Sequence, residues 1–216
     1  MDGLIFRKTA PDDRPALEAL WREAFGEDGA WFFDAIDAPG YCADDGAVCA
    51  MAFTIPQTLV LDRGEFPAAY IYAVATARRC RGRGLATELL RVIEENLRAE
   101  GVCGAVLVPA TPPLFPLYER MGWRVWACRP AAAPFADAPC SAEEYLSLRR
   151  EALPRPFLQP PECVVRCYRT HRGGAASPDG QIAESFGAPV TNVPFAMAKA
   201  FTDDFPAQGY FSLALE

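Results

Sequence analysis

The feature that most constrains this chain is an arginine- and glycine-rich segment, residues 78–84, that stands directly before an apolar helical pattern. Four of its seven residues are arginine, although the chain carries a net charge of -7. The first amides of a helix lack partners within the helix, and the helix dipole places partial positive charge beside them. Glycine leaves the approach to these amides open for an anion. The segment therefore predicts an anion site suited to a pyrophosphate, with the arginines as further ligands.

The residues around this segment narrow the kind of site. A P-loop would need Gly-Lys-Ser/Thr, and the two glycines stand too close to the helix for a dinucleotide-binding motif. The order Arg79-x-x-Gly82-x-Gly84 after a strand resembles the signature of the GNAT superfamily of N-acetyltransferases. Residues 73–76 resemble the end of that family's fourth strand, and residues 117–123 resemble its tyrosine-containing segment. The alternative interpretation is an arginine-rich surface loop that caps an ordinary helix.

The resemblance covers residues 4 to about 129 and implies acetyl-coenzyme A as the co-substrate, with no metal. It implies that the pantetheine arm lies along the fourth strand, where the backbone N–H of Val74 polarises the thioester carbonyl. It also implies that backbone amides of the arginine-glycine segment hold the pyrophosphate. The expected cofactor-binding residues are Val74, Thr76, Arg79, Arg81, Gly82, Arg83 and Gly84.

Two further residues are assigned to the chemistry. Tyr118 matches the family's tyrosine near the cofactor sulfur. A phenol has a reference pKa of about 10 and is protonated at neutral pH, so Tyr118 is the expected general acid for the departing thiolate. Its alternative role is to pack against the sheet. Glu65, just before the fourth strand, is the candidate general base, and Glu23, Asp34 or a water are the alternatives.

Strand and helix patterns alternate along the first part of the chain, which indicates an α/β or α+β protein. The resemblance implies a GNAT-like mixed, mostly antiparallel sheet flanked by helices. Helices are predicted to begin after Asp12 or Asp13 and near residues 30, 84 and 115, and Gly26 and Gly101 end the first and third. The predicted strands are residues 4–7, 41–43, 47–61, 66–76, 102–108 and 123–128, and Asp44-Asp45-Gly46 is the predicted hairpin turn between the second and the third.

The domain organisation is predicted from the change in composition after residue 130. Residues 1–130 are expected to form the GNAT-like domain. Residues 131–216 are expected to form a C-terminal extension that packs on the first part or supplies an oligomer contact, as in a homodimer. Within this extension, Ser141 and Glu144 form a capping box that starts a helix. Residues 163–169 and 210–215 are predicted strands, and residues 195–201 are ambiguous.

Composition and charge limit the function classes. Residues 78–130 carry 9 basic and 5 acidic side chains, whereas residues 1–77 carry 5 and 13, so the middle of the chain suits a polyanionic cofactor. The eight cysteines include no Cys-x-x-Cys pair, and we expect reduced, mostly buried thiols in place of a metal site. A signal-peptide pattern and a long apolar segment are both absent from the sequence, so a cytoplasmic protein with no membrane contact is expected.

The expected activity is transfer of the acetyl group of acetyl-coenzyme A to an amine of a small molecule or a protein. The alternative is a non-catalytic sensor module that binds acyl-coenzyme A. The acidic total and the lack of interleaved aromatic residues argue against nucleic-acid binding through the arginines. A weaker resemblance, carried by residues 73–76 and 81–86, points to the enhanced-intracellular-survival branch of the superfamily.

Overall fold

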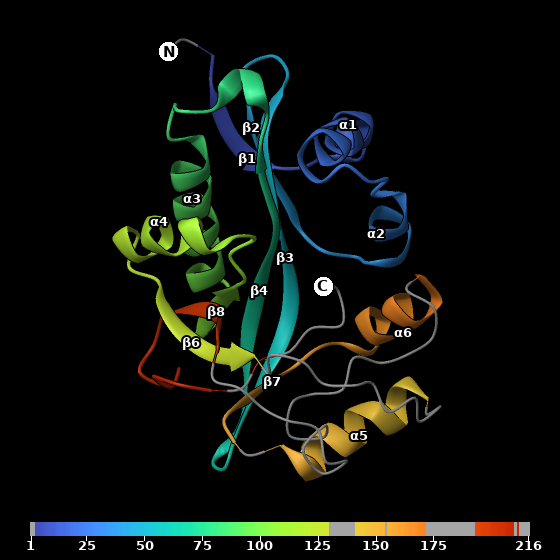
Figure 1. The fold of residues 1–216 in the computed structure, drawn as a ribbon, viewed down its shortest axis with the longest axis vertical. Helices are drawn as coiled ribbons and strands as arrows, with labels where there is room; N and C mark the ends of the chain where they lie inside the picture. The colour runs from blue at the N-terminus through green and yellow to red at the C-terminus, as the bar shows by residue number, and fades with distance from the viewer. Residues whose placement is uncertain (1–2, 130–140, 154, 172–192, 210, 212–216) are drawn as a thin grey trace. The chain divides into compact units, whose positions relative to one another are not determined.

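The computed structural model describes residues 3–129, 141–153, 155–171, 193–209 and 211. Its strands form one sheet in the order β1-β2-β3-β4-β5-β8-β6, and β7 pairs with β3 (Figure 1). Every strand pair with a described register is antiparallel. The predicted class, a mixed and mostly antiparallel sheet flanked by helices, is therefore confirmed. By contacts between residues, the chain divides into two compact units, residues 1–55 with 69–101 and residues 56–68 with 102–216.

The first unit joins the N-terminal strands to three helices. Residues Ile5 and Cys42 lie opposite Asp44 and Met51 in the antiparallel ladders of this unit. Figure 1 shows α3 on one side of these strands and α1 and α2 on the other. The elements are β1 (Ile5–Lys8), η1 (Pro11–Asp13), α1 (Arg14–Phe25), α2 (Ala30–Ala35), β2 (Gly40–Asp44), β3 (Val48–Leu61, to residue 55), β4 (Gly64–Thr76, from residue 69), η2 (Arg78–Cys80) and α3 (Leu85–Ala99).

Local sequence explains most of these boundaries. The predicted hairpin turn forms between β2 and β3, where the Asp44 carboxylate accepts a hydrogen bond from the Gly46 amide at 2.8 Å. Gly26 ends α1 in the left-handed conformation, as predicted. The predicted capping of α1 is wrong in one respect, because Asp13 takes the N-cap position without bonding the helix. Its carboxylate instead pairs with Arg7 at 2.6 Å and accepts the Ala10 amide at 2.6 Å.

An aromatic cluster forms the core of the first unit. The ring of Trp21 stacks on Phe32 with centroids 5.1 Å apart, and both side chains are 1% exposed. Trp21 also meets the edge of Tyr72 at 5.8 Å, and Phe32 meets Phe53 at 4.9 Å. These contacts fix strand β4 at Tyr72, two residues before Val74, the residue predicted to bind the thioester carbonyl.

The second unit contains the remaining strands and helices. Strand β8 lies between β5 and β6 and is antiparallel to both, with Gly104 opposite Ala200 and Arg124 opposite Ala198. Residues 193–200 therefore belong to the same sheet as β5 and β6, while the predicted boundary at residue 130 stays a prediction. The elements are β5 (Gly104–Leu107), η3 (Pro112–Leu114), α4 (Phe115–Arg120), β6 (Arg124–Arg129), α5 (Ala142–Ala152), β7 (Phe157–Gln159), α6 (Glu162–His171) and β8 (Val193–Ala200).

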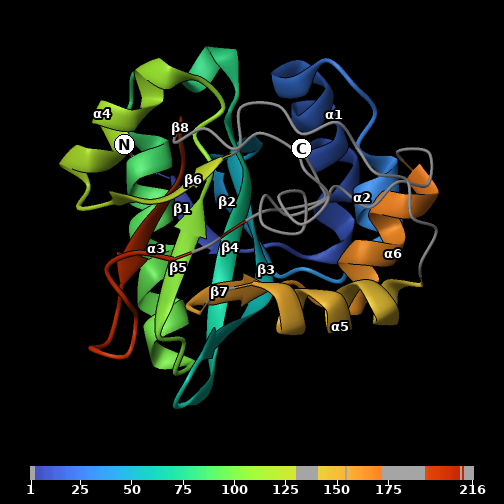
Figure 2. The same ribbon diagram turned by 60° about the horizontal axis from the view of Figure 1, so that its bottom comes forward.

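Helices α5 and α6 lie side by side and share a small apolar cluster of Ala142, Tyr145 and Val165 (Figure 2). The strand predicted at residues 163–169 is wrong, because this segment is helix α6. Adjacent valines favour strands, but the Pro161 carbonyl accepts the Val164 amide at 3.1 Å and starts a helical turn. Residues 131–139, which their composition predicts to be a linker, and most of the strand predicted at 210–215 lie outside the described residues. No helix in the described part of the chain has the length and apolar character needed to cross a membrane.

The capping box that starts α5 gives a stability prediction. The Ser141 hydroxyl accepts the Glu144 amide at 3.0 Å, and the Glu144 carboxylate accepts the Ser141 amide at 2.5 Å. Ser141→Ala leaves the Glu144 amide without this acceptor and should lower the free energy of unfolding by about 1 kcal/mol in urea denaturation. Ser147→Ala, an exposed change in the same helix, is the control and should be neutral or slightly stabilising. Equal effects of the two substitutions would contradict the cap.

Candidate functional site

The end of strand β4 departs from regular geometry at Ala73. Its φ of 51° makes it the only non-glycine residue with a positive φ in the described part of the chain. The alternation of buried and exposed side chains expected of a strand is lost here, since Tyr72, Ala73 and Val74 are all partly exposed. A residue in this conformation inside a strand interrupts the pairing ladder and re-aims the neighbouring backbone groups. The strain therefore lies directly before Val74, whose amide is the predicted partner of the thioester carbonyl.

Hydrogen bonds from three directions hold the loop after β4. The Ala77 amide donates to the Cys49 carbonyl of β3 at 2.8 Å, and the Cys80 amide donates to the Ala77 carbonyl at 2.8 Å. From helix α1, the Glu23 carboxylate accepts the Arg78 amide at 2.6 Å. The Arg81 guanidinium donates to the Thr76 carbonyl at 3.2 Å. The loop thus enters η2 and α3 along a fixed path.

The two glycines of the loop adopt a conformation that other residues resist. Gly82 has a φ of 75° and Gly84 a φ of 74°, and a Cβ built on either would meet no atom within 4 Å. Glycine is therefore required here by backbone angle, while the space above the backbone is open. Gly84 is the N-cap of α3 and has no side chain to bond the first turn. Among the described residues, no side chain accepts the amides of Leu85, Ala86 or Thr87.

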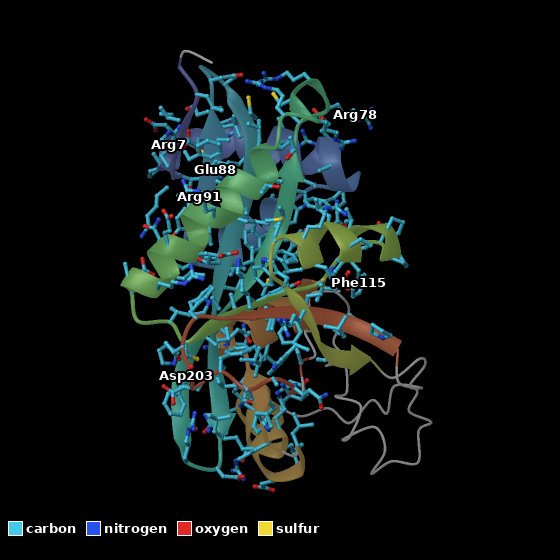
Figure 3. All side chains as sticks on the ribbon, turned by 90° about the vertical axis from the view of Figure 1, so that its left-hand side faces the viewer. Arg7, Arg78, Glu88, Arg91, Phe115 and Asp203 are labelled. Atoms are coloured by element: carbon cyan, nitrogen blue, oxygen red, sulfur yellow. The ribbon has the colours of Figure 1, made fainter. Side chains whose placement is uncertain are left out.

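The arginines of the loop differ in what they contact. Arg83 lies 3.2 Å and Arg79 lies 3.6 Å from the carboxylate of Asp45 in the β2–β3 turn. Hydrogen bonds from the Cys49 thiol and from Arg83 lower the pKa of Asp45. Arg78, labelled in Figure 3, has an exposed side chain with no ion-pair partner in the described part of the protein. Asp45 thus pairs with two of the four arginines of the loop, while Arg78 and Arg81 form no ion pair within the described residues.

Tyr118 lies in the second unit, on the short helix α4. The helix begins at Phe115, as predicted from the prolines before it, and the Tyr118 side chain is 7% exposed. Burial raises the pKa of its hydroxyl above the ordinary value for a phenol. The group is therefore protonated at neutral pH, as a proton donor must be. The Tyr118 carbonyl accepts the Met121 and Trp123 amides at 2.9 and 3.1 Å, which ties the end of α4 to the start of β6.

Glu65, the candidate base, also lies in the second unit. Its carboxylate is exposed and forms an ion pair with Arg150 of helix α5. It stands near the start of β4, nine residue steps before Val74, and an extended strand of that length spans about 30 Å. Glu65 would have to leave Arg150 to accept a proton, and its role stays a prediction.

The first unit thus brings seven predicted residues into one continuous stretch of backbone. Val74 and Thr76 end strand β4, and the loop follows with Arg79, Arg81, Gly82, Arg83 and Gly84. Three contributions were not foreseen from the sequence: the positive φ of Ala73, the bond from Glu23 to the loop amide, and the pairing of Asp45 with two arginines. The first has no sequence signal in an alanine. The other two join residues more than thirty positions apart.

The first part of the chain matches a known family of proteins. Residues 6–126 match the model of the acetyltransferase (GNAT) domain, and this stretch is more than half of the chain. The chain belongs to the GNAT family of acetyltransferases. The resemblance inferred from the arginine-glycine motif is therefore confirmed. A search of curated protein sequences found no significant match.

Solved GNAT-type structures share the fold at low sequence identity. A conserved protein of unknown function from Enterococcus faecalis aligns with a TM-score of 0.67 and 13% identity, over 91% of this chain and 72% of that one. A GCN5-related N-acetyltransferase from Anabaena variabilis aligns with a TM-score of 0.61 and 16% identity, over 76% and 47%. One from Kribbella flavida gives 0.58 and 21%, over 74% and 48%. The chain spans about half the length of these last two proteins, and the likeness shows the fold alone.

The bond from Glu23 to the loop can be tested without any ligand. A hydrogen bond to a charged group contributes roughly 1.5–3 kcal/mol when buried and less when exposed. Glu23→Ala should therefore speed hydrogen exchange of the amides in residues 78–84 by about tenfold, measured by mass spectrometry. Glu27→Ala is the control, because the Glu27 carboxylate has no hydrogen bond within the described residues. Unchanged exchange in the Glu23 variant would show that the loop is held by other contacts.

Proposed function

We propose that the protein transfers the acetyl group of acetyl-coenzyme A to an amine of a small molecule or a protein. The observation that carries this proposal is the uncapped start of α3, where Gly82 and Gly84 leave backbone amides open beside a cluster of arginines. A family of acetyltransferases that shares this loop supports the same assignment. Pyrophosphate bound there would gain both the helix dipole and charge-assisted hydrogen bonds.

The contacts of the loop also suggest which of its groups bind which phosphates of the cofactor. The pyrophosphate would take amides between Arg79 and Gly84. Arg78, which has no ion-pair partner among the described residues, suits a further phosphate such as the one on the ribose. Arg79 and Arg83 would reach phosphate by exchanging the Asp45 carboxylate for it. Asp45 therefore competes with the cofactor for the same two cations.

The chemistry needs a polarised carbonyl and a proton for the leaving sulfur. Acetyl-coenzyme A supplies an acetyl group activated as a thioester. The Val74 amide, positioned by the turn at Ala73, would donate a hydrogen bond to the carbonyl oxygen and stabilise its developing negative charge. The Tyr118 hydroxyl, which is protonated at neutral pH like any phenol and whose pKa burial raises further, would give its proton to the thiolate. An alkylammonium acceptor loses its proton before attack, and a water near Val74 is the proposed base, because Glu65 stands nine residue steps from Val74, about 30 Å along an extended strand.

The alternative is that the protein binds acyl-coenzyme A as a sensor and does not turn it over. Release of free coenzyme A thiol from acetyl-coenzyme A, measured with a panel of alkylamines, polyamines and peptides, separates the two. An enzyme should give amine-dependent thiol release and an acetylated product. Tight binding without release by any amine would favour the sensor. A cytoplasmic location and a homodimer contact stay predictions.

The first variant tests the pyrophosphate site. Gly82→Glu places a carboxylate and a Cβ where the anion should lie, so the affinity for coenzyme A in calorimetry should fall by about 100-fold, or roughly 2.7 kcal/mol. Gly101→Glu is the matched control, because Gly101 has a φ of 77° and the same open surroundings at the opposite end of α3. The control carries similar backbone strain and should leave the affinity unchanged. Equal affinities of the two variants would reject the site.

The second variant tests the proton donor. Tyr118→Phe removes only the hydroxyl, so kcat should fall by about 10- to 100-fold while the affinity for coenzyme A stays the same. Tyr41→Phe removes another buried hydroxyl and should leave kcat unchanged. A Tyr118 variant with full turnover would leave Tyr118 with a packing role alone.

A further inference from the structure

Two cysteines of the first unit lie in direct contact beneath the loop. Cys49 is on strand β3 and Cys80 is in η2, and their Sγ atoms are 3.0 Å apart. Both are free thiols, and their side chains are 0% and 1% exposed. Burial, and then the hydrogen bond from Cys80, raises the pKa of the Cys49 thiol. The Cys80 thiol donates a hydrogen bond to the Cys49 sulfur across this distance.

A metal ion is the first explanation to consider for this pair. The Asp45 carboxylate and the two sulfurs lie within 4.8 Å of one another, which is a ligand set that a soft divalent cation accepts. However, two sulfurs bound to one tetrahedral zinc at about 2.3 Å each lie about 3.8 Å apart, further than these are. The Asp45 carboxylate is also engaged by two arginine cations, which oppose the approach of another cation.

The spacing and the charges thus favour a bond between the sulfurs themselves. A disulfide needs an S–S distance of about 2.0 Å, so one sulfur must approach the other by about 1 Å. We propose that Cys49 and Cys80 form a redox-active pair that is oxidised reversibly to an intramolecular disulfide. The oxidant in this proposal is hydrogen peroxide. It oxidises one thiol to a sulfenic acid and is itself reduced, with release of one water. The sulfur of the second thiol then attacks the sulfenic sulfur and forms the S–S bond. The hydroxide displaced in this step takes up the thiol proton and leaves as a second water.

The disulfide would join two segments that the backbone already connects. The Ala77 amide donates to the carbonyl of Cys49 itself, three residues before Cys80, so the backbone needs little rearrangement. The bond would close a loop between positions 31 residues apart and fix η2 to β3. Oxidation would then hold residues 78–84 in the conformation described above. This inference does not depend on what the loop binds.

The test uses the full-length protein, fully reduced and then treated with hydrogen peroxide. Remaining thiols are alkylated under denaturing conditions, and the protein is digested without reductant. We expect a linked peptide pair that contains Cys49 and Cys80 and that dithiothreitol separates. The melting temperature should rise on oxidation by on the order of 5–10 °C, because the cross-link restricts the unfolded chain. Exchange of the amides in residues 78–84 should slow in parallel.

Three variants make the result specific. Cys49→Ala and Cys80→Ala should each abolish the linked peptide and the rise in melting temperature. The melting temperature of each oxidised variant is compared with that of the same variant in reduced form, so that a loss of stability caused by the substitution itself does not affect the comparison. Cys42→Ala removes an equally buried thiol of the neighbouring strand and should preserve both effects. Separate alkylation of both thiols after peroxide, or their oxidation to sulfinic acids without a link, would overturn the proposal. Stoichiometric zinc retained by the reduced protein and lost in Cys49→Ala would overturn it in favour of a metal site.

Discussion

The site depends on how the backbone passes from strand β4 into helix α3. Two hydrogen bonds hold the start of this passage, from the Ala77 amide to β3 and from the Arg78 amide to the Glu23 carboxylate of α1. After them the chain turns twice through positive φ angles at Gly82 and Gly84 and enters the helix with no capping side chain. The Ala77 and Arg78 amides before the two glycines have acceptors, whereas the first amides of α3 after them have none among the described side chains. The unsatisfied amide donors are therefore concentrated at the start of α3. The proposed anion site rests on this contrast.

Electrostatic contacts within the protein oppose the binding of an anion to the same loop. Arginines packed closely in an otherwise acidic protein repel one another, and Asp45 relieves part of that repulsion by contacting Arg79 and Arg83. The contact holds the side chains of Arg79 and Arg83 at the β2–β3 turn, and a phosphate that bound to these two arginines would have to displace it. In the proposed site, a single carboxylate from a turn distant in sequence would therefore reduce the net gain from binding through these two arginines. Exposed pairs of this kind contribute little each, so such an exchange is energetically feasible.

The part of the fold that could be predicted is the part set by local sequence. The Asp-Gly turn after β2, the capping box at Ser141 and the glycines flanking α3 each act within a few residues, and their elements lie where expected. The error at residues 163–169 arose because Val164 and Val165 favour a strand locally, whereas the preceding proline starts a helix. The place of β8 could not be predicted, because it depends on pairing with residues about ninety positions away. In the site, the motif identified the loop, but Ala73 and Asp45 contribute through conformation and distance that the motif does not encode.

Strand β8 has a consequence for how the protein assembles on the ribosome. It lies between β5 and β6, so β5 lacks a partner on one edge and β6 lacks its partner strand in the described sheet until residues 193–200 have been synthesised. The nascent chain must therefore carry unpaired strand edges of both β5 and β6 through the synthesis of helices α5 and α6. Contacts of such long sequence separation close late and slowly, and open edges invite pairing with other chains. The yield of folded protein during rapid expression should thus depend more on how long these strand edges stay unpaired than on the final stability of the sheet.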